Sequence, residues 1–395
     1  VENQSLAYDK AGNAYTMGVP FNKSTEVLGV NGYFLDYAAS KDASLGTIPA
    51  TWAEWEVKGV DYLHLMDELA GKFVYAKISD DDHAYDFEVK ESYKDAVAGK
   101  ELIFDMSKNS LNHDKYGNVT RNYRVFSWDA SDNMFITIVR QWGSMYTSYT
   151  ADDAKTTKHG YAEFASNVVD EGNTKSRREL TKEAMEYFRK GYTDGWFGLP
   201  QHFSEDSYGS TGFKNNRVMF VVCSSGGLSY NVSASQRLRL APIPYKDATR
   251  KYVISQGTNL ALFDSVPADK EYDAFKMIVD FTTGDTQAEW AFNTGYYPAS
   301  KSATQSKIYQ DLLAADYHDN KSKQAYQESA KLNEEHYMDA DKGWVKFVDP
   351  GFVGSSSIRT EVDTVMNYVC QITTPESTAQ TMDQILDYIC SRMST

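Results

Sequence analysis

The order of apolar and polar residues predicts two short strands and then a helix near the start of the chain. Ala14–Val19 alternates as a strand does and stops at Pro20, and a second apolar run, Val27–Leu35, follows a polar turn. Thr51 stands three residues before Glu54, which is the spacing of a capping box at a helix start. The first helix is therefore expected to begin at about this point.

The middle of the chain, residues 79–175, is polar and is expected to be rich in loops. Its acidic run Asp80–Asp82 lacks the residue order of a calcium-binding loop and indicates a solvated surface. Met134–Val139 predicts a buried element, but so short a run does not distinguish helix from strand. Helical spacing returns at Ser176–Tyr192.

Apolar strands and amphipathic helices then alternate, which predicts the α/β class with a parallel or mixed sheet. No internal repeat is visible. The predicted strands are Val218–Val222, Leu238–Ile243, Tyr252–Ile254 and Leu260–Phe263. The predicted helices are Pro267–Phe281, Thr286–Phe292, Ile358–Ile372 and Glu376–Met393.

Length and charge narrow the class of protein. At 395 residues the chain exceeds the usual size of one domain, so two lobes are expected. The net charge of -15 argues against a nucleic-acid partner, because phosphate backbones require a cationic face. The 28 Tyr, 19 Phe and 7 Trp residues suit sugar binding, although aromatic residues also fill cores.

Cysteine content and hydropathy exclude further classes. Cys223, Cys370 and Cys390 show no C-x-x-C spacing, so buried thiols are expected and a zinc or dithiol centre is not. No apolar run has the length of a membrane span. The first residues show neither the basic nor the apolar region of an export signal, so any such signal is expected to be missing from this sequence.

Motifs of catalysis are also missing from the sequence, which has no G-x-S-x-G, phosphate-loop, H-E-x-x-H or G-x-G-x-x-G pattern. Adjacent acids such as Glu334-Glu335, and Asp339 near Asp341, leave a secreted carbohydrate-active hydrolase as the alternative. A cell-surface adhesin is a further possibility, and it predicts exposed aromatic residues without a cleft. No enzyme activity, cofactor or metal is expected.

Three features suit ligand binding, and each has a structural alternative. Ser224-Ser225-Gly226-Gly227 ends a predicted strand, where open α/β sheets bind ligands, but it also suits a tight turn. Gly257 interrupts an apolar run, as at a bulge or where a ligand approaches the backbone. Arg359 lies near a predicted helix start and offers a planar donor group for an anion, or alternatively a surface ion pair.

Taken in order, six segments resemble the family 1 extracellular solute-binding proteins of ABC transporters, and within them the glycerol-3-phosphate and glycerophosphodiester binders. The segments are Pro20–Asn31, the helix start at Thr51-Trp52, Phe213–Asn231, Ile254–Phe263, Gln287–Ala303 and Ser355–Asp363. The sugar binders of the same family are the other ligand class that the resemblance allows.

The resemblance implies a periplasmic-binding-protein-like fold, in which two α/β lobes close about a hinge on a ligand. It implies that Ser24 donates a hydrogen bond and that Trp52 stacks on the carbon skeleton of the ligand. Ser225, with Ser224 and the backbone of Gly257, would hold phosphate or hydroxyl groups. Tyr296 and Arg359 would complete an anion clamp.

The resemblance also divides the chain. Residues 1–19 would enter the hinge, 20–253 would form most of the second lobe, 254–300 would return to the first lobe, and 301–395 would complete the second lobe and the hinge. Family members carry a long segment before the one matched by Pro20–Asn31, so the first lobe is expected to be incomplete. A monomer outside the cytoplasmic membrane, held there by its permease or by a lipid anchor absent from this chain, is the expected partner arrangement.

Overall fold

The computed structural model describes most of the chain. The described residues are 6–8, 14–77, 86–95, 97–149, 160–203, 208–233, 237–263, 265–352, 354–370 and 380–393. Within these ranges, no helix has both the length and the apolar character needed to cross a bilayer.

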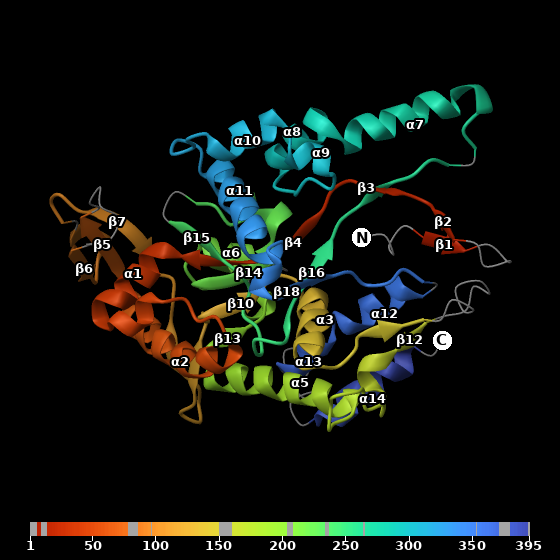
Figure 1. Cartoon of the computed structure of the whole chain (residues 1–395). Coiled ribbons are helices and arrows are strands. Elements are labelled where there is room, and N and C mark those ends of the chain that lie inside the picture. Colours follow the sequence, from red (N-terminus) through yellow and green to blue (C-terminus); the bar gives the residue numbers. More distant parts are fainter. Residues whose placement is uncertain are drawn as a thin grey trace.

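Among the described residues, seven strands form the central sheet (Figure 1). Its order is β13 (Phe197–Gly198), β10 (Phe126–Trp128), β14 (Phe220–Ser224), β4 (Ser24–Asn31), β16 (Lys251–Gln256) and β18 (Trp344–Phe347), and β15 (Leu238–Ala241) also pairs with β4. The register is parallel where β10 meets β13 and β14, and where β16 meets β18. Only β4, which is buried along its whole length, runs antiparallel to its neighbours.

Helices cover this sheet, and we call the sheet with these helices the sheet body. They are α1 (Gly32–Lys41), α2 (Trp52–Leu69), α3 (Ser131–Gln141), α5 (Arg177–Asp194), α6 (Gly209–Lys214), α12 (Ser355–Val362), α13 (Val365–Val369) and α14 (Met382–Met393). Capping boxes begin α2 at Thr51 and α5 at Ser176, and each satisfies amide groups that a helix start leaves unpaired. The apolar helix faces and the sheet form one large buried core.

The described residues also form smaller strands and short 3-10 helices. A three-stranded antiparallel sheet is formed by β6 (Asp86–Lys90), β5 (Phe73–Lys77) and β7 (Glu101–Asp105). Three strand pairs are β1 (Leu6–Tyr8) with β2 (Ala14–Thr16), β8 (Leu111–His113) with β9 (Val119–Arg121), and β11 (Thr147–Ser148) with β12 (Tyr161–Ala162). Short 3-10 helices are η2 (Ala43–Gly46), η3 (Tyr93–Asp95), η4 (Glu163–Ala165), η5 (Pro200–Phe203), η6 (Ser225–Tyr230) and η8 (Ala340–Lys342).

A second region, which we call the helical unit, lies above the sheet body in Figure 1. It comprises β3 (Val19–Pro20), β17 (Asn259–Leu260), α7 (Ala268–Thr282), α8 (Gly284–Thr294), α9 (Lys301–Thr304), α10 (Lys307–Ala314) and α11 (Lys321–Leu332). The described chain passes between the two regions at residues 21–23, at 257–258 and at 333–343, where the π-helix η7 (Asn333–Tyr337) follows α11.

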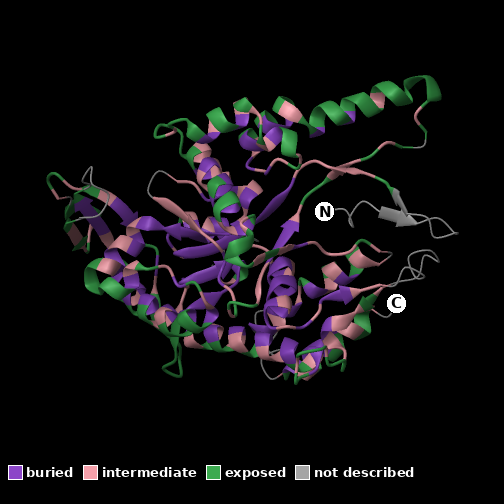
Figure 2. Ribbon diagram, in the orientation of Figure 1, coloured by how far each residue is buried: buried purple, intermediate pink, exposed green. Residues whose placement is uncertain are grey.

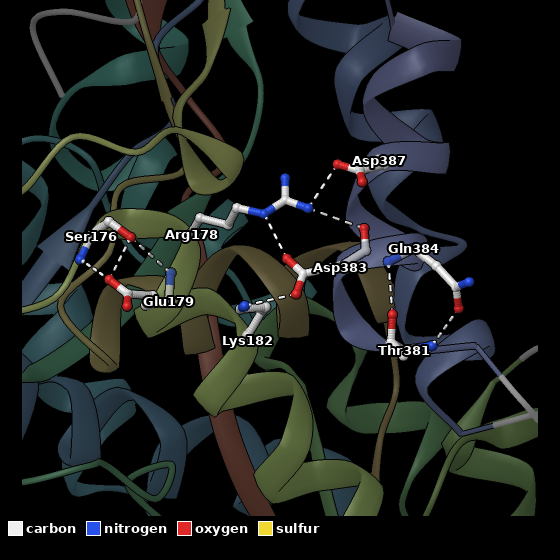
Figure 3. Close-up of polar contacts among 8 residues, drawn as sticks. All are labelled: Ser176, Arg178, Glu179, Lys182, Thr381, Asp383, Gln384 and Asp387. Carbon is white, nitrogen blue, oxygen red and sulfur yellow. Dashed lines mark hydrogen bonds and ion pairs between the residues drawn. The ribbon is translucent and has the colours of Figure 1, made fainter.

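A group of charged side chains fixes the C-terminal helix α14 to α5 (Figure 3). Arg178 Nε donates to Asp383 Oδ1 at 2.8 Å, and its Nη2 donates to Asp387 Oδ1 at 2.7 Å. Lys182 Nζ donates to the other oxygen of Asp383 at 2.8 Å. The last described segment therefore belongs to the sheet body.

The predicted α/β class is confirmed, and the structure corrects several boundaries. The apolar run Val27–Leu35 divides into the end of β4 and the start of α1, because Asn31 caps a helix there. The ambiguous run Met134–Val139 is the middle of helix α3. The region 79–175 was expected to consist mainly of loops, but it also holds short strands and α3, whose patterns are too brief to stand out.

Further corrections concern the second half of the chain. The predicted strand Leu260–Phe263 stops at Leu260. The predicted helix Ile358–Ile372 is described as far as residue 370, and there it is two helices, because the chain turns at Asp363-Thr364 between α12 and α13. The predicted final helix, Glu376–Met393, is described from residue 380 onward, and α14 begins at Met382.

Candidate functional site

The strands of the sheet bring polar residues together at one edge. Among the described strands, β13, β10, β14, β16 and β18 run in the same direction, opposite to β4. Asp129, Ser225 and Gly257 directly follow β10, β14 and β16, and Asp349 and Gln201 come shortly after β18 and β13. Since open α/β sheets bind ligands outside the carboxyl ends of their strands, this edge is the candidate site.

A pocket of about 620 Å³, which we call the edge pocket, lies at this edge between the start of α3 and helix α12. Its lining consists of Asp129, Ala130, Ser131, Asp132, Gln201, Tyr208, Ser356, Arg359, Thr360 and Asp363. Nearly all of these side chains are polar, and their hydroxyl, amide, carboxylate and guanidinium groups can exchange hydrogen bonds with a hydroxyl-bearing ligand.

Arg359 is held in the wall of this pocket by three side chains. Its Nε donates to Asp132 Oδ2 at 2.6 Å, its Nη1 donates to Asp349 Oδ2 at 3.2 Å, and its Nη2 donates to Asn133 Oδ1. Two carboxylates therefore already balance the positive charge of Arg359.

Asn133 connects Arg359 to the strands. Its amide exchanges two hydrogen bonds with Gln256, at 2.9 and 2.7 Å. Gln256 ends β16 and pairs with Ser24, the first residue of β4. This network joins the predicted residues Arg359 and Ser24 through two residues that the sequence analysis did not select.

Burial alters the ionisation of the carboxyl groups around the edge pocket. It raises the pKa of Asp129 and of Asp363, and it raises the pKa of Asp349 to about 6 against the opposing effect of Arg359 and Arg140. Burial also raises the pKa of Glu26 to about 8, although Trp128 Nε1 donates to this carboxyl at 2.7 Å. The edge of the sheet therefore carries more carboxyl groups than cations.

Four of the predicted residues meet where the chain passes between the two regions. Ser24 and Ser225 are buried: Ser24 begins β4, Ser225 directly follows the adjacent strand β14, and Ser225 Oγ accepts from the amide of Thr25 at 3.4 Å. Tyr296 lies against the turn after β14, because a β-carbon on Gly226 would be 3.0 Å from its ring. Ser224, half-buried, ends β14 beside them.

Gly257 is required at this passage for a reason internal to the chain. Its φ is +127°, and a β-carbon there would lie 1.5 Å from the carbonyl oxygen of Asn22. Its own carbonyl accepts from Lys23 Nζ at 3.1 Å. The glycine thus allows two of the connecting segments to touch.

Trp52 lies elsewhere, in the core instead of on a pocket. Its side chain is fully buried, its Nε1 donates to Gln141 Oε1 at 2.6 Å, and its ring packs edge-on against Phe188 at 4.9 Å. In this structure Trp52 has no surface on which a ligand could stack, and it is left out of the site proposed below.

The residues that sequence reasoning missed are Asp129, Asp132, Asn133 and Gln256. Asp129 directly follows the short apolar strand β10, and Asp132 and Asn133 stand in the first turn of α3. A polar residue directly after a buried strand was the available signal, but β10 is only three residues long and does not stand out from the sequence around it.

Two groups of acidic residues bear on the chemistry that the sequence analysis considered. No set of three or more His, Cys, Asp or Glu side chains within the described ranges could hold a metal ion. The acids that suggested a hydrolase, Glu334 and Glu335, are exposed on η7 and do not line the edge pocket.

Comparison with known proteins identifies the family of this chain. A family model described as bacterial extracellular solute-binding protein matches residues 2–316. No curated protein matches the chain in sequence.

Several solved structures share the fold of this chain at low sequence identity. UgpB from Mycobacterium tuberculosis in complex with glycerophosphocholine is 15% identical, with a TM-score of 0.56 over 96% of this chain and 70% of that one. Maltose-bound MalE3 of T. maritima is 13% identical, with a TM-score of 0.56 over 96% and 72%. The substrate-binding protein Lmo0181 from Listeria monocytogenes, in complex with cycloalternan, is 13% identical, with a TM-score of 0.56 over 96% and 71%. These likenesses confirm the two-lobed, periplasmic-binding-protein-like α/β fold.

Proposed function

The chain belongs to the bacterial extracellular solute-binding proteins, and from this premise we propose that it is the substrate-binding component of an ABC importer. It captures a small polar solute outside the cytoplasmic membrane and delivers it to the permease. The proposal includes a monomer that does no chemistry, attached at the membrane through its permease or a lipid anchor.

The observation that carries this proposal is the edge pocket itself. It combines a volume of about 620 Å³ with an almost wholly polar lining, at the carboxyl edge of the sheet. The connecting segments at 21–23 and 257–258 lie at the same edge, since Ser24 and Gln256 pair there. A solute held at this position would therefore touch the sheet body close to the hinge.

The two regions supply the lobes of the proposed hinge. We propose that the sheet body, which holds most of the elements within residues 20–253, corresponds to the second lobe. We propose that the helical unit extends the first lobe beyond residue 300, and the packing of α10 and α11 on α8 supports this. We therefore propose 333–343, with the π-helix at its start, as the last of the hinge segments.

We further propose that the solute is an uncharged, hydroxyl-rich compound such as a sugar. Arg359 is already paired with Asp132 and Asp349, and Asp129 and Asp363 add further acidity. A phosphate would have to enter against these carboxyl groups, whereas hydroxyl groups can donate to them.

A glycerophosphodiester is the second candidate, and Arg359 is the observation that favours it. Its guanidinium fork lines the edge pocket and could exchange Asp349, at 3.2 Å, for a phosphate oxygen. Ser24, Ser224, Ser225, Gly257 and Tyr296 remain proposed contacts for either ligand.

A thermal-shift screen with maltose, maltotriose, glycerol-3-phosphate and glycerophosphocholine tests the function and the ligand class together. A ligand at a hundredfold excess over its Kd adds about 2.7 kcal/mol to the stability of the folded chain. We expect the sugars to shift the unfolding temperature, and a shift with the phosphates alone would favour the second candidate.

The control uses two arginines. Arg359→Ala should weaken binding of the active ligand at least tenfold, whereas Arg392→Ala, which changes an exposed partner of Glu361, should leave it unchanged. The absence of any shift across all four ligands would contradict the proposed function.

A further inference from the structure

A second pocket, of about 260 Å³, lies where the crossing segment 333–343 meets the sheet body. Lys251 and Trp344, which begin the paired strands β16 and β18, line it together with His336 and Lys342 of the crossing segment. We call it the lysine pocket. It lies at the amino-terminal ends of β16 and β18 and shares no lining residue with the edge pocket, so it is a separate place on the molecule.

The walls of the lysine pocket are mostly apolar and are held by contacts within the chain. The half-buried rings of Tyr245 and Trp344 meet edge-on, with 5.7 Å between their centres and an interplanar angle of 89°. The amide of Tyr245 donates to the carbonyl of Ala50 at 3.1 Å. The amide of Ile243 donates to the hydroxyl of Tyr337 at 2.9 Å. The pocket is therefore preorganised and does not depend on a loop closing over it.

Three side chains that can donate hydrogen bonds line this pocket, and none of the described residues in its lining carries a carboxyl group. The Lys251 amine lies 4.8 Å from the centre of the Tyr245 ring and donates to the carbonyl of Lys342 at 3.0 Å, which leaves it two further protons to donate. The side chains of His336 and Lys342 form no hydrogen bond or ion pair within the part of the chain that the structure describes. In a chain whose net charge is -15, this lining is a local exception that favours an anion.

The apolar walls and the size of the lysine pocket narrow the class of anion. An inorganic anion would meet the lysines but would leave the surfaces of Tyr245, Trp344 and Pro242 uncovered, and covering apolar surface is favourable. Sites for drug-sized ligands have volumes of about 300–1,000 Å³, so this smaller pocket suits a ligand with one ring. A carboxylate on such a ring uses both the apolar walls and the donors.

We propose that the lysine pocket binds a small organic carboxylate that carries a single apolar ring. The ring packs against Tyr245, Trp344 and Pro242, and the carboxylate accepts hydrogen bonds from Lys342 and Lys251. His336 can donate a further one whether its ring is neutral or protonated. This site goes beyond the proposed function, and it stands or falls independently of the solute that the edge pocket binds.

Three small probes test the two parts of this ligand separately. Phenylacetate has the ring and the charge, phenylacetamide keeps the ring without the charge, and acetate keeps the charge without the ring. In ligand-observed NMR titrations of the whole chain, phenylacetate should bind at least about tenfold more tightly than either of the other two, because each lacks one set of contacts. Equal affinities for phenylacetate and phenylacetamide, or no binding of phenylacetate, would overturn the site.

A lysine variant locates the bound anion. Lys342→Gln removes a charge from an exposed side chain that has no partner among the described residues, so the unfolding temperature should not change. Phenylacetate should bind this variant about three- to tenfold more weakly, the effect of one hydrogen bond to a charged group near the surface. The matched control is Lys108→Gln, which changes an exposed lysine that lines neither pocket and should bind phenylacetate as the parent does.

Arg359 provides the competing location for an anion. If Arg359→Ala lost phenylacetate binding and Lys342→Gln kept it, the carboxylate would lie in the edge pocket and the assignment to the lysine pocket would be wrong. Equal affinities of Lys342→Gln and Lys108→Gln would contradict the assignment in the same way. Neither result would affect the proposed function, which the sugar and phosphate screen tests.

Discussion

The sheet body and the helical unit use similar amphipathic helices but bury them to very different degrees. In α5, the apolar positions Leu180, Ala184 and Phe188 are all buried against the sheet body. In α7, only Ile278 and Thr282 are buried (Figure 2). The spacing of apolar residues therefore predicts that a helix forms. Whether its apolar face is buried depends on a partner surface, which the spacing does not specify.

The cores of the two regions differ in the same way. Six buried residues, from α8 to α11, make up the core of the helical unit, whereas the core of the sheet body extends through the whole sheet. Large apolar side chains of the helical unit lie on its surface. They include Phe263, Tyr272, Phe275, Met277 and Trp290, with exposed fractions of 81%, 72%, 50%, 59% and 47%. Stability should therefore be concentrated in the sheet body.

Truncating one phenylalanine in each region gives the largest expected contrast. Phe188 is fully buried and packs against Trp52 and Phe197, at 4.9 and 5.0 Å between ring centres. Phe188→Ala should lower the free energy of unfolding by about 3–5 kcal/mol, because it leaves a cavity. Phe275→Ala, on the exposed face of α7, should change it by about 0.5 kcal/mol or less. Urea unfolding measures both, and equal losses would show that α7 is covered in solution.

Adding a β-carbon at Gly257, where the chain passes between the two regions, should have the next largest effect on the free energy of unfolding. Gly257→Ala places an atom against the Asn22 carbonyl and forces an unfavourable φ of +127°, so we expect a loss of about 2–4 kcal/mol. Gly71→Ala is the matched control in the sheet body. Its φ is +81° and no atom lies within 4 Å of the added carbon, so only the backbone cost of about 1 kcal/mol should remain. Similar losses would mean that the segments at 21–23 and 257–258 separate easily.

Local rules explain what the sequence could predict. The capping box of Thr51 and Glu54 lies within four residues, and the structure contains it. The turn at Ser224-Ser225 was recognised as a strand end, and β14 does end there. Gly257 was recognised as unusual, but its cause is the carbonyl of Asn22, and a contact between residues so far apart in the sequence leaves no local signal.

The rest of the site depends on which strands become neighbours. Asn133 meets Gln256 because β10 pairs with β14, and both β14 and β16 pair with β4. The burial of Trp52 likewise follows from its contact with Phe188, on a distant helix. A tryptophan at a helix start suits either a ligand or a core, and its sequence neighbours do not decide between them.

The pH dependence of stability tests the buried carboxyl group of Glu26 in the sheet body. The folded pKa of Glu26 is about 8 and its ordinary value is 4.5, so between these values the folded chain binds a proton that the unfolded chain has lost. Stability should therefore fall as pH rises from 4.5 to 8, with a slope of up to about 1.4 kcal/mol per pH unit from this group. Glu26→Gln should flatten that part of the profile, whereas Glu289→Gln, on the exposed surface of α8, should not. An unchanged slope in Glu26→Gln would contradict the buried, protonated state.

Ion pairs give the smallest expected contrast between the regions. Asp383 accepts from both Arg178 and Lys182 and so ties α14 to α5 (Figure 3). Asp311 of the helical unit pairs with Lys307, four residues away on the same helix. Because the Asp383 side chain is 50% exposed, solvent screens its pairs, and Asp383→Asn should lower the free energy of unfolding by about 0.2–1 kcal/mol. Asp311→Asn should cost less, since it joins no separate elements.

Salt and acid should both reduce the effect of Asp383. The side chains of Lys182 and Arg178 lower the pKa of this carboxyl, so its contribution is present at neutral pH and is lost as pH falls through the folded pKa. Urea unfolding of parent and Asp383→Asn at low and high ionic strength, and again in acid, measures this loss. If parent and Asp383→Asn still differed in stability at high salt, Asp383 would act by packing α14 against α5 and not through its charge. Apolar packing would then account for the greater stability of the sheet body.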